Sequence, residues 1–244
     1  MAKTTPRLHV ADTLADGTDL TLGPEQSHYL AHVLRLGPGD AVSLFNNESG
    51  EVLAYITSVA KKSVSLRCER QVHAVQPPPD IDYVFAPLKH QRLDYLVQKA
   101  TELGARRLQP MITARTIAER VNLERMRANV IEAAEQCNLV FVPQVLEPKS
   151  FTSLMKDWDQ KRAIIFCDET AFNADARTAL SKLAPPAAVF VGPEGGFTGE
   201  ERTLLKSLPN VAAISLGPRI MRADTAAVAA LALVQATIGD WQSR

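Results

Sequence analysis

The stretch AAVFVGPEGGFTGEERTLLKSLPNVAAISLGPRIMRADTAAVAALALVQATI spans residues 187–238 and indicates the fold class. It contains two apolar runs, 187–192 and 211–217. Each is followed by a Gly-Pro loop and a helical segment, over 199–208 and about 225–238. Apolar runs without polar alternation are typical of parallel strands buried on both faces. The stretch therefore predicts two strand–helix units of one parallel sheet.

The same alternation extends back along the chain to residue 81. Expected strands cover 81–88, 107–113 and 163–168, and expected helices cover 92–103, about 122–137 and about 173–183. Because successive parallel strands are joined by helical crossovers, we predict an α/β fold whose sheet carries helices on both faces.

Three consecutive prolines, Pro77-Pro78-Pro79, indicate a domain boundary, because they continue neither a helix nor a central strand. Before them, short β-like runs at 41–45, 51–59 and 63–67 alternate with turn residues, and one helix is expected from residue 27 or 28 to about 36. We predict a small β-barrel-like domain over residues 1–75 and an α/β domain over 76–244.

The composition is that of an ordinary globular protein. Of 244 residues, 46% are hydrophobic and 22% are charged, which excludes a disordered or coiled-coil chain. Lys+Arg 27 balance Asp+Glu 27, so nucleic acid binding through bulk charge is excluded, although a local basic face is not. Residues 86–130 supply such a candidate, with nine Lys or Arg against four acids; a solvated helix face is the alternative interpretation.

The three cysteines, Cys68, Cys137 and Cys167, are far apart and form no C-x-x-C pair. This spacing argues against a disulfide framework or zinc site and fits a reducing cytosol; Cys137 and Cys167 are expected to be buried. Without a signal peptide or an apolar run of bilayer length, we expect a soluble cytoplasmic protein. His28 and His32 lie four residues apart without the glutamate of H-E-x-x-H, so no metal is expected.

The two Gly-Pro loops are the expected ligand site. In an open α/β sheet, ligands bind beyond the carboxyl ends of the strands, where both loops begin. Gly195 and Gly196 allow close approach of the backbone to a ligand, and Thr198 with Glu201 predicts a capping box for the next helix. One such loop would be interpreted as a tight turn, but two after consecutive strands favour a shared pocket.

The loops also narrow the class of ligand. Neither G-x-G-x-x-G nor G-x-x-x-x-G-K-[ST] occurs, so the usual phosphate cradles are absent from the sequence. A nucleoside-like molecule without phosphates, such as S-adenosylmethionine, fits this description. Arg219, Arg222 and Asp224 fall beside the same crevice; an arginine there either pairs with a carboxylate or holds an RNA phosphate. The simplest role for Asp224 or Thr225 is that of a helix N-cap.

These segments resemble the bacterial 16S ribosomal RNA uridine N3-methyltransferase family, which belongs to the SPOUT class. The most specific matches are VGPEGG at 191–196 and LGPRIMRADTAA at 216–227. The resemblance extends to Pro6-Arg7-Leu8, His28 with Val33-Leu34-Arg35, KHQRLDYLVQKATELG at 89–104, and EAAEQ at 132–136 with Pro143. It implies a knotted parallel-sheet domain that binds S-adenosylmethionine, preceded by a PUA-like RNA-binding β-barrel.

The resemblance also implies roles for individual residues. Cofactor binding would fall to Gly192, Pro193, Glu194, Gly195, Gly196, Leu216, Gly217, Arg219, Ile220 and Met221. Among the catalytic residues, Arg222 would stabilise the uridine or its phosphate. Glu194 and Asp224 would accept a proton or orient an arginine. RNA contacts are expected from Arg7, His28, Arg35, Lys89, Arg92 and Lys99.

The expected partner is 16S ribosomal RNA within the small ribosomal subunit, and the enzyme is expected to be a homodimer. The final helix is apolar on most faces, so it must be buried in the core or against another subunit. Two alternatives stay open: a SPOUT enzyme acting on another RNA position, and a non-catalytic RNA-binding or ribosome-assembly factor.

Overall fold

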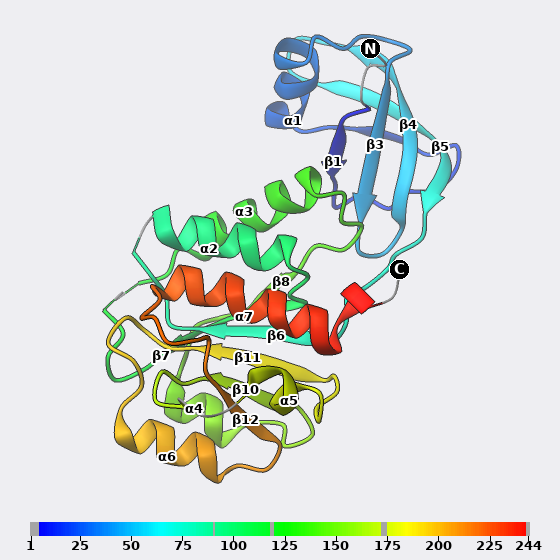
Figure 1. Ribbon diagram of the computed structural model, residues 1–244. Helices are drawn as coiled ribbons and strands as arrows, with labels where there is room; N and C mark the ends of the chain where they lie inside the picture. The colour runs from blue at the N-terminus through cyan, green and yellow to red at the C-terminus, as the bar shows by residue number, and fades with distance from the viewer. Residues whose placement is uncertain (1–4, 90, 118–119, 172–174, 243–244) are drawn as a thin grey trace. The chain divides into compact units, whose positions relative to one another are not determined.

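The computed structural model describes residues 5–89, 91–117, 120–171 and 175–242 (Figure 1). The chain divides into two compact units. The first unit consists of residues 1–77 with 134–142, and the second consists of residues 78–133 with 143–244. Each unit is built on a β-sheet of its own.

The first unit contains a five-stranded sheet with the order β1-β3-β4-β5-β2. Its strands are β1 (Arg7–His9), β2 (Asp19–Thr21), β3 (Ala41–Asn46), β4 (Gly50–Val59) and β5 (Val64–His73). Neighbouring strands are antiparallel, except that β1 and β3 are parallel. Val52, Ala54 and Ile56 of β4 are buried in one apolar core, as the period-two pattern of a strand requires.

The helical segment of this unit begins earlier than the sequence predicts. α1 (Pro24–His28) starts with a proline, which suits the first helical position because no intrahelical partner is needed for its nitrogen. It continues into the π-helical turn η1 (Tyr29–Val33). Arg35, with φ of 57°, follows the end of this turn, so the helix stops short of residue 36.

The second unit contains the parallel sheet that the apolar runs predict. Its strand order is β12-β10-β11-β6-β7-β8, with β9 paired to β7, and these pairings are parallel. The strands are β6 (Ile81–Phe85), β7 (Arg107–Ile112), β8 (Gln144–Val145), β9 (Lys149–Ser150), β10 (Ala163–Cys167), β11 (Ala187–Val191) and β12 (Val211–Ile214). β11 is buried at every residue, which explains why its sequence has no polar alternation.

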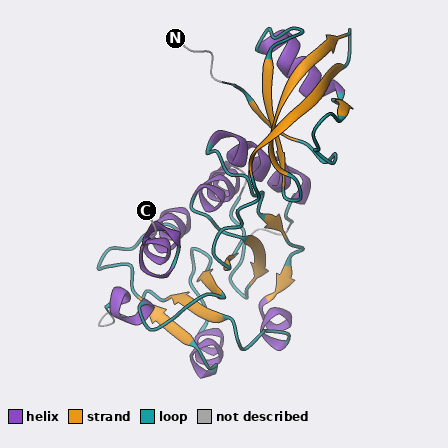
Figure 2. Cartoon of the chain, turned by 90° about the vertical axis from the view of Figure 1, so that its right-hand side faces the viewer, coloured by secondary structure: helices purple, strands orange, loops and turns teal. Residues whose placement is uncertain are grey.

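Helices cover both faces of this second sheet. They are α2 (Gln91–Glu102), α3 (Leu123–Gln136), α4 (Phe151–Lys156), α5 (Ala176–Leu180), α6 (Gly199–Ser207), α7 (Ala223–Ile238) and the short η2 (Asp240–Gln242). α2 and α7 lie on one face, α4 and α6 lie on the other, and Figure 2 shows helices around the strands from a second direction. On the α4 side, Phe151, Phe166, Phe190 and Phe197 lie in one apolar core.

The final helix, α7, is buried along one side only. Its buried residues are Ala223, Ala227, Ala230, Leu231, Val234 and Gln235. The amide of Gln235 donates to the Leu103 carbonyl oxygen over 2.8 Å and so ties α7 to the end of α2. Val228, Ala232 and Leu233 stay partly exposed, so the all-round burial expected from the sequence is not reached within this chain.

The elements that the sequence analysis did not predict are short. They are β1, β2, β8, β9, α4 and η2, none longer than six residues. α5 is also shorter than predicted, and residue 173, where that helix was expected to begin, lies outside the described residues.

Candidate active site

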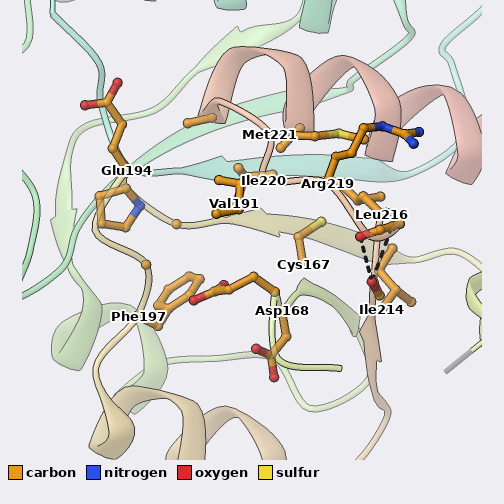
Figure 3. A pocket seen from close by; sticks show the side chains of 18 of the residues that line it. Cys167, Asp168, Val191, Glu194, Phe197, Ile214, Leu216, Arg219, Ile220 and Met221 are labelled. Atoms are coloured by element: carbon orange, nitrogen blue, oxygen red, sulfur yellow. Dashed lines mark hydrogen bonds between the residues drawn. The ribbon is translucent and has the colours of Figure 1, made fainter. Parts of the chain in front are cut away.

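A cavity of about 420 Å³ lies at the carboxyl ends of three adjacent strands, β10, β11 and β12. The loop after β11 and the loop after β12 form most of its lining, and residues after β10 complete it. Figure 3 shows Glu194 and Phe197 from the first loop on one side and Leu216, Arg219 and Met221 from the second loop on the other. Ligand crevices in parallel sheets occur at this edge.

The first loop requires glycine at two positions for steric reasons. A Cβ on Gly192 would lie 2.7 Å from Cε2 of Phe197. Gly196 has φ of +68°, and a Cβ there would lie 2.7 Å from Oε1 of Glu169. The predicted capping box is confirmed: Glu201 N donates to Thr198 Oγ1 over 3.2 Å, and Thr198 N donates to Glu201 Oε2 over 2.8 Å.

The structure brings all ten expected cofactor residues to the wall of this cavity. In the second loop Gly217 adopts φ of +109°, which a residue with a side chain rarely adopts. Arg219 and Ile220 are exposed, whereas Leu216 and Met221 are partly buried. Lining a common cavity is a geometric result, and the binding role of these residues stays a prediction.

Two of the three expected catalytic residues are joined by an arginine from a third element. Nε of Arg92, in the first turn of α2, donates to Oδ2 of Asp224 over 2.9 Å, and Nη1 of Arg92 donates to Oε1 of Glu194. The hydrogen bond from Arg92 lowers the pKa of Asp224. Asp224 is therefore a weak proton acceptor, and of its two expected roles the geometry favours orienting an arginine.

Arg222, the third expected catalytic residue, lies at the N-cap position of α7, and its side chain is exposed. Its side chain forms no capping hydrogen bond with the backbone of the helix. The sequence predicted Asp224 or Thr225 as the N-cap residue, and this prediction is wrong by two or three positions. Asp224 instead lies in the first turn, where a carboxylate interacts favourably with the helix dipole.

An acidic pair after β10 is part of the cavity wall and was not predicted. Asp168 is buried and accepts hydrogen bonds from Thr170, and its Oδ2 lies 2.7 Å from Nζ of Lys206. Burial alone would raise the pKa of Asp168, but the bonds from Lys206 and Thr170 outweigh it and the net pKa is lowered. Its neighbour Glu169 is exposed and pairs with Arg202 of α6. The sequence could have predicted this acidic pair, because both acids directly follow the apolar run AIIFC and so lie at the carboxyl end of a predicted strand.

The cysteines are less uniformly buried than predicted. Cys167 lines the cavity and is partly buried, and desolvation raises the pKa of its thiol to about 12. Cys137 is exposed, so its expected burial is wrong. It directly follows Gln136, the last residue of α3.

The second-unit cations expected to contact RNA have different surroundings. Lys89 is exposed and lines a small cavity of about 150 Å³ together with Arg92, Pro193 and Glu194. Lys99 donates to Glu102 over 2.7 Å, and Arg92 is engaged by two carboxylates as described above. Lys89 is thus the most available of the three.

In the first unit, Arg7 is a structural residue. Its guanidinium donates to the carboxylate of Glu51 over 2.8 Å and to the carbonyl oxygens of Ala134, Glu135 and Leu139 over 2.9–3.1 Å. Only 10% of its side chain is exposed, so the RNA contact expected of Arg7 is not supported.

His28 and Arg35, by contrast, are exposed. The ring of His28 lies 5.0 Å from that of His32. Across the described part of the chain, no three His, Cys, Asp or Glu side chains are grouped as metal ligands. Within the same residues, no helix has the length and apolarity needed to span a membrane.

Comparison with family models assigns the class of protein. Residues 76–235 match a model described as an RNA methyltransferase domain, and residues 22–68 match an RNA methyltransferase PUA domain. The matched segments contain both loops of the cavity and most of the first sheet. The chain therefore belongs to the RNA methyltransferases.

Within that class, this chain belongs to the ribosomal RNA small subunit methyltransferase E family. The protein of that name from Rickettsia conorii is 33% identical, and the match covers 94% of each chain. The crystal structure of the Neisseria gonorrhoeae protein of that name, bound to S-adenosylmethionine, is 27% identical with a TM-score of 0.83, covering 97% of this chain and 99% of that one. A Legionella pneumophila protein described as a methyltransferase, in complex with the same cofactor, is 29% identical with a TM-score of 0.85, covering 98% and 100%. The family expected from the loop motifs is confirmed.

Proposed function

We propose that this protein transfers a methyl group from S-adenosylmethionine to N3 of a uridine in the 16S ribosomal RNA of the small subunit. The observation that carries the proposal is the cavity between the two Gly-Pro loops, in a chain whose relatives are named as small-subunit ribosomal RNA methyltransferases. Relatives solved with S-adenosylmethionine support the choice of cofactor.

The cavity fits S-adenosylmethionine in size and in chemistry. Its volume of about 420 Å³ falls within the range of small-molecule sites. Three acids, Asp168, Glu169 and Glu194, line it together with Arg219. Each acid is paired with a cation outside the lining, so the cavity offers carboxylate oxygens as acceptors for an ammonium group and no excess of negative charge. Val191, Phe197, Ile214 and Leu216 add apolar surface for an adenine ring. When bound, the cofactor supplies an electrophilic methyl group.

The chain's own residues must then handle the proton on N3 of uridine. Transfer at N3 requires that this proton leave, and a cation beside the base favours the resulting anion. Arg222 carries a guanidinium group, whose fork of donors suits a base edge or a phosphate, and it is exposed beside the second loop, so we assign it to the base or its phosphate. Glu194 also accepts a hydrogen bond from Arg92, but its side chain is 47% exposed against 18% for Asp224. Glu194 is therefore the candidate proton acceptor, and Asp224 orients Arg92.

RNA binding is assigned to exposed cations and imidazoles in each unit. His28 and Arg35 supply contacts in the first unit, which matches a PUA domain, and Lys89 supplies one beside the active site. Such contacts to phosphate weaken as salt is added. The chain carries no net charge, so these local groups and not bulk attraction would position the RNA.

Finer features of fold, assembly and location complete the proposal. The chain around the cavity forms the trefoil knot of the SPOUT class, and the first sheet closes into a PUA-like barrel; the order of β12, β10 and β11 and the two neighbouring loops support the knot. The enzyme is a cytoplasmic homodimer that needs no metal. The partly exposed side of α7, with Val228, Ala232 and Leu233, supplies an apolar surface for a second subunit.

The test is transfer of labelled methyl from S-adenosylmethionine to small ribosomal subunits that lack uridine N3-methylation, followed by mass spectrometry of the nucleosides. We expect 3-methyluridine as the labelled product. A different methylated nucleoside, or labelled ribose, would show that the enzyme acts at another position. Absence of both transfer and cofactor binding would favour a non-catalytic RNA-binding factor.

A further inference from the structure

We infer that Arg92 is a positioning residue that clamps the two cavity loops together and thereby sets the affinity for the cofactor. The inference rests on the proposed function, because it concerns the same cavity. It assigns to Arg92 a role inside the protein in place of the RNA contact expected from the sequence.

The geometry of the guanidinium is the first argument. Arg92 belongs to α2, Glu194 to the loop after β11, and Asp224 to the first turn of α7, which directly follows the loop after β12. One side chain therefore bonds the first loop and the start of the helix that ends the second loop, through Nε to Asp224 and Nη1 to Glu194. Nη2 of Arg92 is shielded from solvent and has no hydrogen-bond partner among the described residues, while 34% of the side chain as a whole is exposed. Only an arginine offers separate donors in a rigid fork for two carboxylates.

The two carboxylates differ in how firmly they are held. The side chain of Asp224 is 18% exposed and also accepts a hydrogen bond from Thr225 N over 2.8 Å. The side chain of Glu194 is 47% exposed. Hydrogen bonds to Asp224 and Glu194 raise the pKa of Arg92, so its charge persists at every accessible pH. Asp224 is thus the fixed anchor of the clamp, and Glu194 is the arm that can release.

The position of the clamp explains how it would act on a cofactor that Arg92 does not touch. Glu194 lines the main cavity, and Arg92 lies behind it, beside the small second cavity. Without the clamp, the two loops would have to be ordered by the ligand itself, and this ordering subtracts from the binding free energy. The clamp pre-organises the loops before the ligand arrives.

Titration calorimetry with S-adenosylmethionine tests the clamp in the full-length protein. We expect Arg92→Ala and Asp224→Asn each to weaken binding about tenfold, and Glu194→Gln to weaken it less, because its ion pair is the more exposed. The double variant Arg92→Ala/Asp224→Asn should bind no more weakly than either single variant, because both remove one interaction. Arg92→Lys keeps the charge without the fork and should also lose affinity while remaining folded.

Asp94→Asn is the matched control. Asp94 lies on the same helix as Arg92, its side chain is also 18% exposed, and it pairs with Arg125 through two hydrogen bonds of 2.9 and 2.6 Å. Because this pair does not reach either loop, cofactor affinity should stay unchanged.

Several outcomes would overturn the clamp. If Arg92→Ala and Arg92→Lys bind S-adenosylmethionine as tightly as the wild type but bind small ribosomal subunits more weakly, then Arg92 contacts RNA and is not a clamp. Additive losses in the double variant, or an equal loss in Asp94→Asn, would show a general effect on stability. Failure of the wild-type protein to bind S-adenosylmethionine would refute the proposed function as well, which separates that failure from a failure of the clamp alone.

Discussion

Nε of Arg7 donates to Oε1 of Glu51 over 2.8 Å, and the two side chains are only 10% and 8% exposed. Glu51 also accepts a hydrogen bond from Ser43 over 2.6 Å, and its other oxygen lies 2.9 Å from Nδ1 of His73. The remaining donors of Arg7 reach carbonyl oxygens of residues 134–139. This ion pair therefore fastens the segment that returns to the first unit from α3.

Arg7→Ala should destabilise the protein by about 3 kcal/mol, because it leaves a buried carboxylate and three carbonyl oxygens without their donor. Urea unfolding followed by circular dichroism measures this loss. Arg67→Ala is the control: its pair with Asp19 is about 60% exposed, so stability should not change. If the Arg7→Ala protein has wild-type stability but binds small ribosomal subunits poorly, Arg7 contacts RNA and does not hold the fold together.

Gly196→Ala should destabilise the first cavity loop by about 1–2 kcal/mol and weaken cofactor binding, because φ of +68° is unfavourable for alanine; the exposed Glu169 carboxylate near the new Cβ can move aside. Thermal unfolding with and without S-adenosylmethionine measures both effects. Gly199→Ala is the control. Gly199 is the first residue of α6, and a Cβ added there would have no described atom within 4 Å. Equal behaviour of the two variants would contradict the steric argument.

Asp168→Asn should lower the free energy of unfolding at neutral pH by about 2 kcal/mol. This loss is smaller than for a fully buried ion pair, because the partner Lys206 is 48% exposed to solvent. The pKa of Asp168 is lowered in the folded protein, so its contribution is complete above the unfolded pKa of about 4 and is lost as pH falls through the folded pKa. Unfolding curves of both proteins from pH 7 downward should therefore converge only in acid. A difference that stays constant into strong acid would refute this linkage.

Arg222→Ala should abolish methyl transfer and leave cofactor affinity nearly unchanged, because Arg222 is exposed and lies outside the wall of the main cavity. Single-turnover transfer to small subunits and calorimetry with S-adenosylmethionine measure the two quantities separately. Equal loss of both would show that Arg222 holds the cofactor and not the RNA.

The sequence predicted the elements whose patterns are local. The apolar runs of β10 and β11 stand out because both strands are buried on each face, and the Thr198–Glu201 capping box follows from a three-residue spacing. Short edge elements such as β8 have too few residues to produce a period, so they were not predicted. The N-cap of α7 was misplaced because Arg222 fills it without a side-chain bond, which no propensity signals.

The sequence by itself determined the family, the parallel sheet and the two loops, because these depend on residue types at fixed spacing along the chain. Only the tertiary structure decided which charges meet. Arg92 is separated by about a hundred residues or more from Glu194 and Asp224, and Arg7 is similarly distant from Leu139, yet both are bonded. Nothing in a local pattern distinguishes a cation directed toward solvent from one directed toward a buried carboxylate. That difference depends on where the folded chain places the opposite charge, because an ion pair requires two groups within a few ångströms in space.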